Sequence, residues 1–496
     1  MTQAALPALR LPYAFAKSQG LVLGAESDGG IEAFVHSGTS PRALAEARRA
    51  YGIRIGAVRM LDATAFERQL AEAYSRSDQT AAEVADDIGQ ELDLSRLVQE
   101  LPPIEDLLES ADDAPIIRMI NALFTQAVRE GASDIHIEPF EQHCAVRFRI
   151  DGVLRDVIRP HRMLHIPMIS RIKIMAQLDI AEKRLPQDGR ISVRIGGKAI
   201  DVRVSTVPAS HGERAVLRLL DKNPARLSLD VLGMAPDTLA QVDALIHRPH
   251  GIFLVTGPTG SGKTTTLYAA LSRLNAAEIN VMTVEDPVEY ELANIGQIQV
   301  NSRIDLTFAR ALRSILRQDP DVIMIGEIRD LETAQIAVQA SLTGHLVLAT
   351  LHTNDTASAV TRLVDMGVEP FLLVSSLVGV LAQRLVRRLC VACRQPHAPD
   401  AAELAQFAGM RPPTVLYHAT GCAQCSDTGY SGRMGIYELL EITDPIRRMI
   451  HERASDQAIR EHARELAAVR FLREDGLRWV GAGESMLEEI LRATRD

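Results

Sequence analysis

Cysteine, tryptophan and net positive charge are all scarce in this sequence, and each scarcity disfavours a class of protein. The 496 residues include five cysteines, too few for a disulfide-rich secreted scaffold of this length. The net charge is −10 and there is one tryptophan. Proteins that bind nucleic acid are commonly basic and stack bases on aromatic rings, so we expect no nucleic-acid partner.

Long apolar runs are also missing. The longest uncharged apolar stretch, residues 370–383, is interrupted by two serines and a glycine. It is shorter than the ~20 residues that a membrane-spanning helix needs. The first 24 residues lack the basic start and apolar centre of a secretory signal. We therefore expect a cytoplasmic protein, or one that something else holds at a membrane.

The remaining composition is that of an ordinary globular protein, 46% apolar and 24% charged, with room for roughly three domains. Between residues 78 and 113, twelve acidic side chains accompany a single basic one, Arg96. A flexible linker over 76–114 is the plain interpretation of this stretch, and an acidic docking segment is the alternative. Ahead of it, residues 1–75 have the apolar pattern of a small α+β docking module without a chemical motif.

Residues 115–221 have a mixed pattern. Apolar residues recur at helical spacing from Ile116 to Ala127, and alternating strands follow at 134–138 and 145–150. Asp151-Gly152 then predicts a type I′ hairpin turn. We expect an α+β domain that ends near 221, followed by a second linker over 222–240.

The segment 241–496 shows a different pattern again. Four short apolar runs, at 252–255, 281–284, 322–325 and 346–349, alternate with helical segments. Such runs are typical of parallel strands that are buried on both faces, which predicts an α/β fold. Each run is followed by polar residues, and ligands of such sheets bind beyond the carboxyl ends of the strands. The four polar clusters therefore predict one site.

The first of these clusters is a phosphate-binding loop of the form GxxxxGK[ST]. It lies between the 252–255 strand and a helical segment, as the motif requires. Glycines let backbone N–H groups converge on phosphate, while Lys263 would bridge the β- and γ-phosphates of ATP and Thr264 would bind Mg²⁺. The candidate nucleotide-binding residues are Gly257, Pro258, Thr259, Gly260, Ser261, Gly262, Lys263, Thr264 and Thr265.

The other strand ends supply candidates for catalysis. Glu327 follows an apolar strand, as a Walker B acid does, and would organise Mg²⁺ or polarise the attacking water. Glu285 could be a second carboxylate that activates water, and the alternative is a purely structural turn. His352 could sense the γ-phosphate, and the alternative is a satisfied core histidine.

Four cysteines form two CxxC pairs, Cys390 with Cys393 and Cys422 with Cys425, separated by 28 residues. This pattern suits a structural Zn²⁺ ion held by four thiolates, within an insert at 388–427. Redox chemistry or plain burial of the thiols are the alternatives. His397 and His418 could replace a ligand but are more simply bystanders, and Cys144 is interpreted as a core thiol.

The ordered motifs GPTGSGKTT, VEDPVEY, RQDPDVIMIGEIRD and GHLVLATLHTNDT resemble those of the ATPases of bacterial type II secretion and type IV pilus assembly. SDIHIEP, LPQDGR and GERAVLRLL extend the resemblance over about 115–496. It implies a RecA-like P-loop domain preceded by a PAS-like α+β domain, with ATP, Mg²⁺ and Zn²⁺ as cofactors. The four cysteines are similar to those of secretion and pilus-extension ATPases and are characteristically absent from pilus-retraction ATPases.

The resemblance also implies a homo-hexamer in which arginines of the preceding domain reach the γ-phosphate. The matching residues are Arg203 and Arg218, with Arg190 and Arg194 as less certain candidates. An arginine finger of this kind is worth ~10³–10⁵ in rate. The alternative is that these arginines form ordinary ion pairs on the surface of the sheet.

The resemblance implies an ATPase that acts at the cytoplasmic side of the inner membrane, where it would power growth of a pseudopilus. Its expected partners are the cytoplasmic domain of an L-type membrane protein, bound by the amino-terminal module, and an F-type platform protein. A basic cluster of Arg384, Arg387, Arg388 and Arg394 suggests contact with anionic lipid, or else a solvated helix face. Three rival functions remain open at this stage: a type IV pilus assembly ATPase, a nucleic-acid translocase and a nucleotide-binding regulator without turnover.

Overall fold

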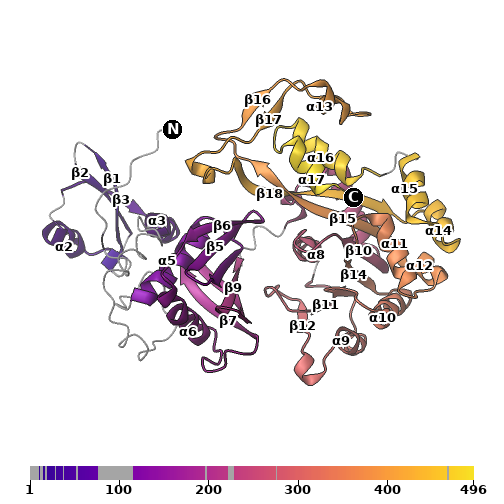
Figure 1. Cartoon of the computed structure of the whole chain (residues 1–496), viewed down its shortest axis with the longest axis horizontal. Helices are drawn as coiled ribbons and strands as arrows, with labels where there is room; N and C mark the ends of the chain where they lie inside the picture. Colours follow the sequence, from indigo (N-terminus) through magenta and orange to yellow (C-terminus); the bar gives the residue numbers. More distant parts are fainter. Residues whose placement is uncertain are drawn as a thin grey trace. The chain divides into compact units, whose positions relative to one another are not determined.

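The computed structural model of the chain describes residues 11, 15–16, 19–27, 30–36, 38–51, 54–75, 115–195, 198–221, 228–274, 276–465 and 469–495. The chain divides into two compact units, Met1–Lys222 and Asn223–Asp496 (Figure 1). The acidic stretch and the linker expected over 76–114 lie outside the described residues, so they stay a prediction.

The first part of the chain forms a three-stranded sheet in the order β1-β2-β3, with β1 antiparallel and β3 parallel to the central strand. Leu21, Val35, Ala47, Phe66 and Leu70 form its core, so two helices pack on the sheet. The module has the α+β character that its sequence predicts. Its elements are β1 (Leu21–Ser27), β2 (Gly30–His36), α2 (Pro41–Tyr51), β3 (Ile55–Leu61) and α3 (Ala63–Ser75).

A six-stranded sheet in the order β6-β5-β4-β9-β8-β7 follows, and all of its neighbouring strands are antiparallel. One face packs on two helices. Asp151 and Gly152 both have positive φ, 48° and 86°, so the predicted type I′ turn is confirmed. The elements are α5 (Pro115–Arg129), β4 (Asp134–Pro139), β5 (Cys144–Ile150), β6 (Val153–Ile158), α6 (His165–Met175), β7 (Gln187–Ile195), β8 (Lys198–Ala209) and β9 (Gly212–Asp221).

The second unit is built on a seven-stranded, mostly parallel sheet in the order β12-β11-β13-β14-β10-β15-β18, in which β18 is antiparallel to β15. Its strands are β10 (Gly251–Thr256), β11 (Val281–Glu285), β12 (Gly296–Gln299), β13 (Val322–Ile325), β14 (Leu346–Leu351), β15 (Leu377–Leu389) and β18 (Tyr430–Glu441). Its helices are α7 (Pro236–Ile246), α8 (Lys263–Arg273), α9 (Phe308–Ile315), α10 (Leu331–Leu342), α11 (Thr356–Asp365), α12 (Pro370–Ser376), α14 (Asp444–His451), α15 (Asp456–Glu465), α16 (Leu472–Gly481) and α17 (Leu487–Ala493). A small two-stranded sheet, β16 (Gln395–His397) and β17 (Leu416–His418), and α13 (Ala401–Ala405) occupy the insert between β15 and β18.

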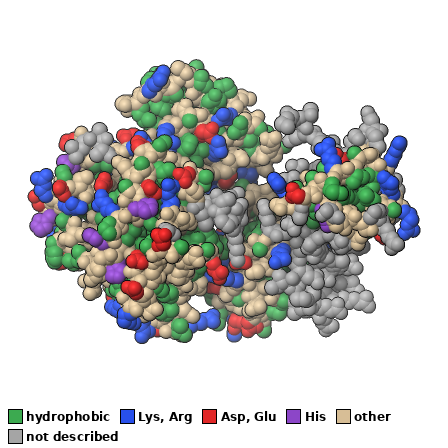
Figure 2. All heavy atoms as spheres, turned by 180° about the vertical axis from the view of Figure 1, so that it is seen from behind, with side chains coloured by type: hydrophobic (Ala, Val, Ile, Leu, Met, Phe, Trp, Pro, Cys, Tyr) green, Lys and Arg blue, Asp and Glu red, His purple; other side chains and the backbone are tan. Residues whose placement is uncertain are grey.

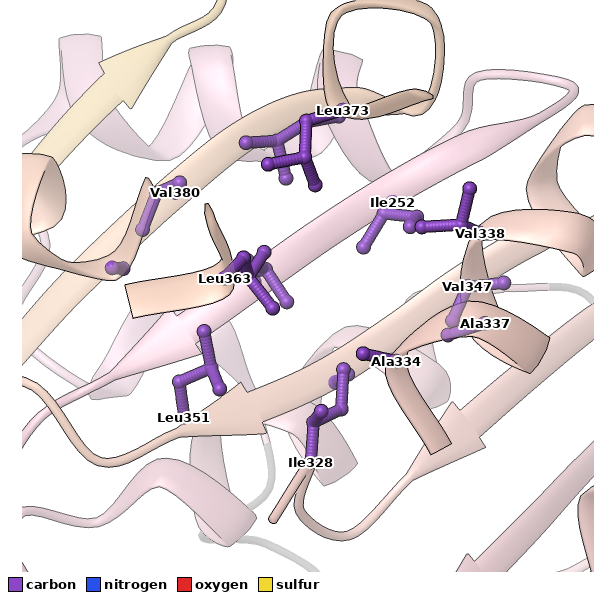
Figure 3. Close-up of a cluster of buried hydrophobic side chains, with 14 of the residues drawn as sticks. Ile252, Ile328, Ala334, Ala337, Val338, Val347, Leu351, Leu363, Leu373 and Val380 are labelled. Atoms are coloured by element: carbon purple, nitrogen blue, oxygen red, sulfur yellow. The ribbon is translucent and has the colours of Figure 1, made fainter. Parts of the chain in front are cut away.

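The continuous apolar runs of the central strands are explained by burial on both faces. In β10, Ile252 and Leu254 enter one core, which includes residues of α9 to α12, while Phe253 and Val255 enter a second core formed with α7 and α8. Figure 3 shows Ile252 close to Val338 of α10 within the first core. The alternation that fits a half-exposed strand is absent because neither face of these strands meets water.

The linker expected over 222–240 is shorter than predicted. Residues 222–227 lie outside the described residues, but a 3₁₀ turn, Leu229–Val231, and helix α7 follow directly. Leu229 and Met234 are buried in the core beneath α8. The second unit therefore includes residues that the loop-like sequence around Pro224 had assigned to a linker.

The basic cluster is a second correction, because its first three members lie on strand β15 rather than on a helix. Arg387 forms a two-pronged ion pair with Glu489, with Nη2–Oε2 2.8 Å and Nε–Oε1 3.1 Å. Arg388 and Arg394 share Glu484. Arg384 donates to the carbonyl of Ala493 at 2.5 Å. These contacts pair the guanidinium groups with acceptors of the chain itself, although the Arg388 side chain stays 51% exposed. Contact of this cluster with anionic lipid stays a prediction.

Among the described residues, no helix combines the length and the apolar content that crossing a bilayer requires.

The ion pair of Glu489 predicts a pH dependence of stability. Burial works to raise the pKa of Glu489, but hydrogen bonds from Arg387 and Arg492 outweigh it and hold the pKa at about 2, below the ordinary 4.5. The paired carboxylate therefore stabilises the fold fully above pH 4.5, and this stabilisation is lost as the pH falls toward 2. We expect Glu489→Gln to lower the melting temperature at pH 7, by an amount that shrinks below pH 4.5. Glu488→Gln, at an exposed position of the same helix, is the control, and a pH-independent difference for Glu489→Gln would contradict the prediction.

Candidate active site

The phosphate-binding loop connects β10 to the amino terminus of α8. Gly257 and Gly262 have φ values of 148° and 88°. A Cβ at Gly257 would come within 2.3 Å of the Gln383 carbonyl oxygen, and one at Gly262 within 2.9 Å of the Gln383 side chain. Only glycine leaves room for the loop backbone to lie this close to Gln383. Pro258, Thr259, Gly260, Thr264 and Thr265 are exposed, so the rim of the loop is open to a ligand.

Lys263 is folded back into this loop. Its ammonium donates to the carbonyl oxygens of Gly257 at 2.8 Å and Pro258 at 3.1 Å. The side chain is largely buried, and burial lowers its pKa while the nearby charge of Glu327 opposes the shift. The loop carbonyls therefore hold the Lys263 ammonium group where the phosphate oxygens of a bound nucleotide would contact it.

Glu327, His352 and Arg329 lie together beyond the carboxyl ends of β13 and β14. His352 Nε2 is 3.5 Å from Glu327 Oε2, and Arg329 is paired with Glu327 Oε1 and lies 3.8 Å from Asp286. Burial and the charge of Lys263 lower the pKa of His352. The imidazole is therefore neutral near pH 7, when it can both donate and accept a hydrogen bond.

Glu285 is the exception among the predicted acids. Its carboxylate is only 2% exposed and accepts hydrogen bonds from Thr283 at 2.5 Å, Gln297 at 3.1 Å and the Tyr268 hydroxyl. These donors tie it to α8 and to β12 instead of to the group of Glu327. The structure therefore places the Glu285 carboxylate in a buried hydrogen-bond network, and its expected role in water activation stays a prediction. Burial of Glu285 among these donors cannot be read from its position at a strand end.

Gln383 is a residue of the site that sequence reasoning missed. It lies on β15 and is 2% exposed. Its amide nitrogen donates to the Ser261 carbonyl at 2.8 Å, and its amide oxygen accepts from Thr266 at 2.7 Å. One side chain thus joins the loop, the first turn of α8 and the neighbouring strand. Its only sequence signal is an amide directly after the apolar residues Val380, Leu381 and Ala382.

Arg203 and Arg218, on the sheet of the first unit, stand directly opposite each other on β8 and β9. Arg190 of β7 is opposite Arg203 on its other side, and Asp134 of β4 is opposite Arg218. Three arginines therefore lie side by side across three strands. Like charges directly opposite each other destabilise a sheet, and the ion pair of Arg218 with Asp134 offsets part of this repulsion.

The four cysteines of the two CxxC pairs come together in the insert, with all four sulfurs within 4.8 Å of one another. The Sγ–Sγ distances are 3.9 Å for Cys390–Cys422 and 3.8 Å for both Cys393–Cys425 and Cys422–Cys425. Tetrahedral Zn²⁺ with Zn–S bonds of ~2.3 Å requires sulfurs about 3.8 Å apart, so the set fits the ion. Backbone N–H groups of Cys422 and Gly429 point at Cys425 Sγ, each at 3.2 Å, as donors to a thiolate would.

The two histidines near these cysteines are not part of the set. Their rings stack on each other at 3.7 Å, and His397 bonds to Glu403. Cys144 is fully buried in the first unit, where burial raises the pKa of its thiol to about 12. It is a core residue, as predicted.

The bracing role of Gln383 can be tested with Gln383→Leu, which keeps the approximate size but removes both hydrogen bonds. Ser261 and Thr266 then lose buried partners, which costs about 1–3 kcal/mol per group. We expect a lower melting temperature and weaker binding of a fluorescent ATP analogue. Gln395→Leu, at an exposed position in the same chain, should change neither. Unaltered nucleotide affinity in Gln383→Leu would remove the bracing role.

Comparison with known proteins identifies the family of the chain. The sequence model of the family described as Type II/IV secretion system protein matches residues 109–492, and the model of an amino-terminal domain of GSPII protein E matches 10–74. In the solved structures, the Legionella pneumophila ATPase DotB has a similar fold, with a TM-score of 0.56 at 21% identity, covering 79% of this chain and 96% of that one.

Two curated relatives are similar over nearly their whole length. Type II secretion system protein HxcR of Pseudomonas aeruginosa is 60% identical, with 98% of this chain and 99% of the relative covered. Type II secretion system ATPase E of Vibrio cholerae is 54% identical, with 98% and 97% covered. The chain therefore belongs to the type II/IV secretion system protein family and is one of its type II secretion ATPases.

Proposed function

We propose that this ATPase works as a hexamer on the cytoplasmic side of the inner membrane, where ATP hydrolysis powers growth of a pseudopilus and protein export. The observation that carries the proposal is the convergence of Lys263, Glu327 and His352 beyond adjacent parallel strands. This grouping unites a phosphate-binding cation, a carboxylate and a neutral imidazole. A nucleotide-binding regulator would need only the first of them.

Each residue then has a defined part. The loop from Gly257 to Thr265 holds the phosphates by its backbone N–H groups, and Lys263 exchanges its carbonyl partners for β- and γ-phosphate oxygens. Thr264 and Glu327 would hold Mg²⁺, which when bound neutralises charge on the phosphates. Glu327 also takes the proton of the attacking water, and His352 donates to the γ-phosphate.

Arg203 and Arg218 supply positive charge to the γ-phosphate in the transition state. Their support is the position of Arg218 directly opposite Arg203, with an ion pair to Asp134 that leaves the Arg218 side chain 56% exposed. The domain that carries them would close on bound ATP and reopen after hydrolysis. Cycling of this motion around the hexamer would perform mechanical work.

The amino-terminal module, which matches the amino-terminal domain of GSPII protein E, would dock on the cytoplasmic domain of an L-type inner-membrane protein. An F-type platform protein would receive the work. The type IV pilus assembly ATPase weighed from the sequence has less support, although the motor residues and the cysteines suit both functions. The match of the amino-terminal module favours secretion.

A nucleic-acid translocase finds less support. On the face shown in Figure 2, basic and acidic side chains lie interspersed over the described residues, without the continuous basic band that a strand of nucleic acid would follow.

The motor function is tested by Lys263→Ala and Glu327→Gln in the full-length protein. We expect Lys263→Ala to lose ATP binding, and Glu327→Gln to bind ATP but to hydrolyse it about 10²–10⁴-fold more slowly, because a general base is lost. Binding and phosphate release measure these effects, with Glu332→Gln, at an exposed site on α10, as the control. In cells, Lys263→Ala should abolish export and leave any type IV pili intact. Export that survives Lys263→Ala would contradict the motor, and loss of pili alone would favour the pilus alternative.

The proposed zinc site predicts one zinc ion per chain by metal analysis. We expect Cys422→Ser with Cys425→Ser to lose the metal and to lower the melting temperature, because two of four ligands are removed. Cys144→Ser is the matched cysteine control and should retain zinc. A folded wild-type protein without zinc would contradict the site.

A further inference from the structure

Strand β4 carries a row of polar side chains in a buried position. Asp134, His136 and Glu138 are only 3–6% exposed, although the other face of the strand, with Ile135 and Ile137, already fills the apolar core. Buried carboxylates are costly unless positive charge compensates them. Here arginines from the neighbouring strands β5 and β9 provide that compensation.

The two carboxylates divide these arginines between them. Asp134 Oδ1 accepts from Arg218 Nε at 2.9 Å, and its Oδ2 lies 3.7 Å from Arg149 Nε. Glu138 pairs with Arg147 and Arg214, each at 2.5 Å. Only the Asp134 pair includes a member of the arginine row opposite Arg203.

The Asp134–Arg218 pair is buried at one end and open at the other. The Asp134 side chain is 4% exposed, whereas that of Arg218 is 56% exposed. The bond is made by Nε, the guanidinium nitrogen closest to the aliphatic stem. A hydrogen bond from Nε to a fixed acceptor restricts the orientation of the planar guanidinium group. The two terminal nitrogens, Nη1 and Nη2, then lie at the outer end of the side chain.

We propose that Asp134 is a positioning residue for ATP hydrolysis, which orients Arg218 toward the γ-phosphate. The inference rests on the proposed role of Arg218. Without the carboxylate, Arg218 would face the like charge of Arg203 directly across the strands and would turn away from it. With the carboxylate, the guanidinium group is held in one orientation before ATP arrives, so that little ordering remains when the transition state forms.

The test is a double-mutant cycle in the full-length hexamer. Asp134→Asn keeps the size of the side chain and removes the charge. We expect it to lower kcat for ATP hydrolysis about 10- to 100-fold at an unchanged KM, because a misplaced catalytic group costs rate of this order. In an Arg218→Ala background, Asp134→Asn should have no further effect, because the group that it orients is already gone.

Glu138→Gln is the matched control, since it removes an equally buried acid from the same strand. Its effect on kcat, whatever its size, should be the same in both backgrounds. A purely structural role of Asp134 would likewise lower kcat by the same factor with and without Arg218, and that result would overturn the inference. The melting temperature and the mass of the hexamer are measured for every variant. If Asp134→Asn does not fold, Asp134→Glu takes its place in the same cycle, because it keeps the charge but moves the carboxylate.

The outcomes also separate the inference from the proposed function. A wild-type kcat in Arg218→Ala would overturn the arginine role and this inference with it. A low kcat in Arg218→Ala combined with wild-type kcat in Asp134→Asn would overturn only the positioning role.

Discussion

Burial of both faces of strands β11, β13, β14 and β10 is the constraint on which the nucleotide site depends. Parallel pairing in register aligns the carboxyl ends of these strands, and the two cores on either side hold them there. Because the strands cannot shift without unpacking the side chains of both cores, the polar residues that follow them are fixed as well. The phosphate-binding loop, Glu327 and His352 meet at one edge for this reason.

The same sheet connects the nucleotide site to the cysteine insert. Strand β15 carries Gln383, which holds the phosphate-binding loop, and runs on without interruption to Leu389, next to Cys390. Arg387 anchors the intervening part of the strand to Glu489 of α17. One strand therefore contacts both the phosphate-binding loop and the cysteine insert, although its pairing with β18 is irregular between Arg387 and Leu389.

In the six-stranded sheet of the first unit, buried carboxylates are balanced by arginines on the same face. Its apolar face is an ordinary core, but its polar face places arginines opposite one another and buries carboxylates beneath them. Both features cost stability in isolation. Together they partly offset each other, because each buried carboxylate pairs with arginines of the neighbouring strands. The proposed contact of Arg203 and Arg218 with a triphosphate would give this arrangement a function.

Much of this protein could be predicted from the sequence, because the determining physics is local. The loop from Gly257 to Thr264 needs its glycines within one turn, Asp151-Gly152 specifies its own hairpin, and unbroken runs such as 252–255 reveal strands buried on both faces. The CxxC spacing predicted the grouping of the four cysteines.

Only the tertiary structure decided which polar side chains face the site. Glu285 ends a strand as a catalytic acid would, yet its partners arrive from Tyr268 and Gln297 and bury it, while Gln383 reaches the loop from a strand more than a hundred residues away. Arg387 and Arg388 resemble an exposed basic cluster until Glu489 and Glu484 pair with them. Hydrogen bonds and ion pairs between segments distant in sequence depend on packing geometry, which spacing along the chain does not encode.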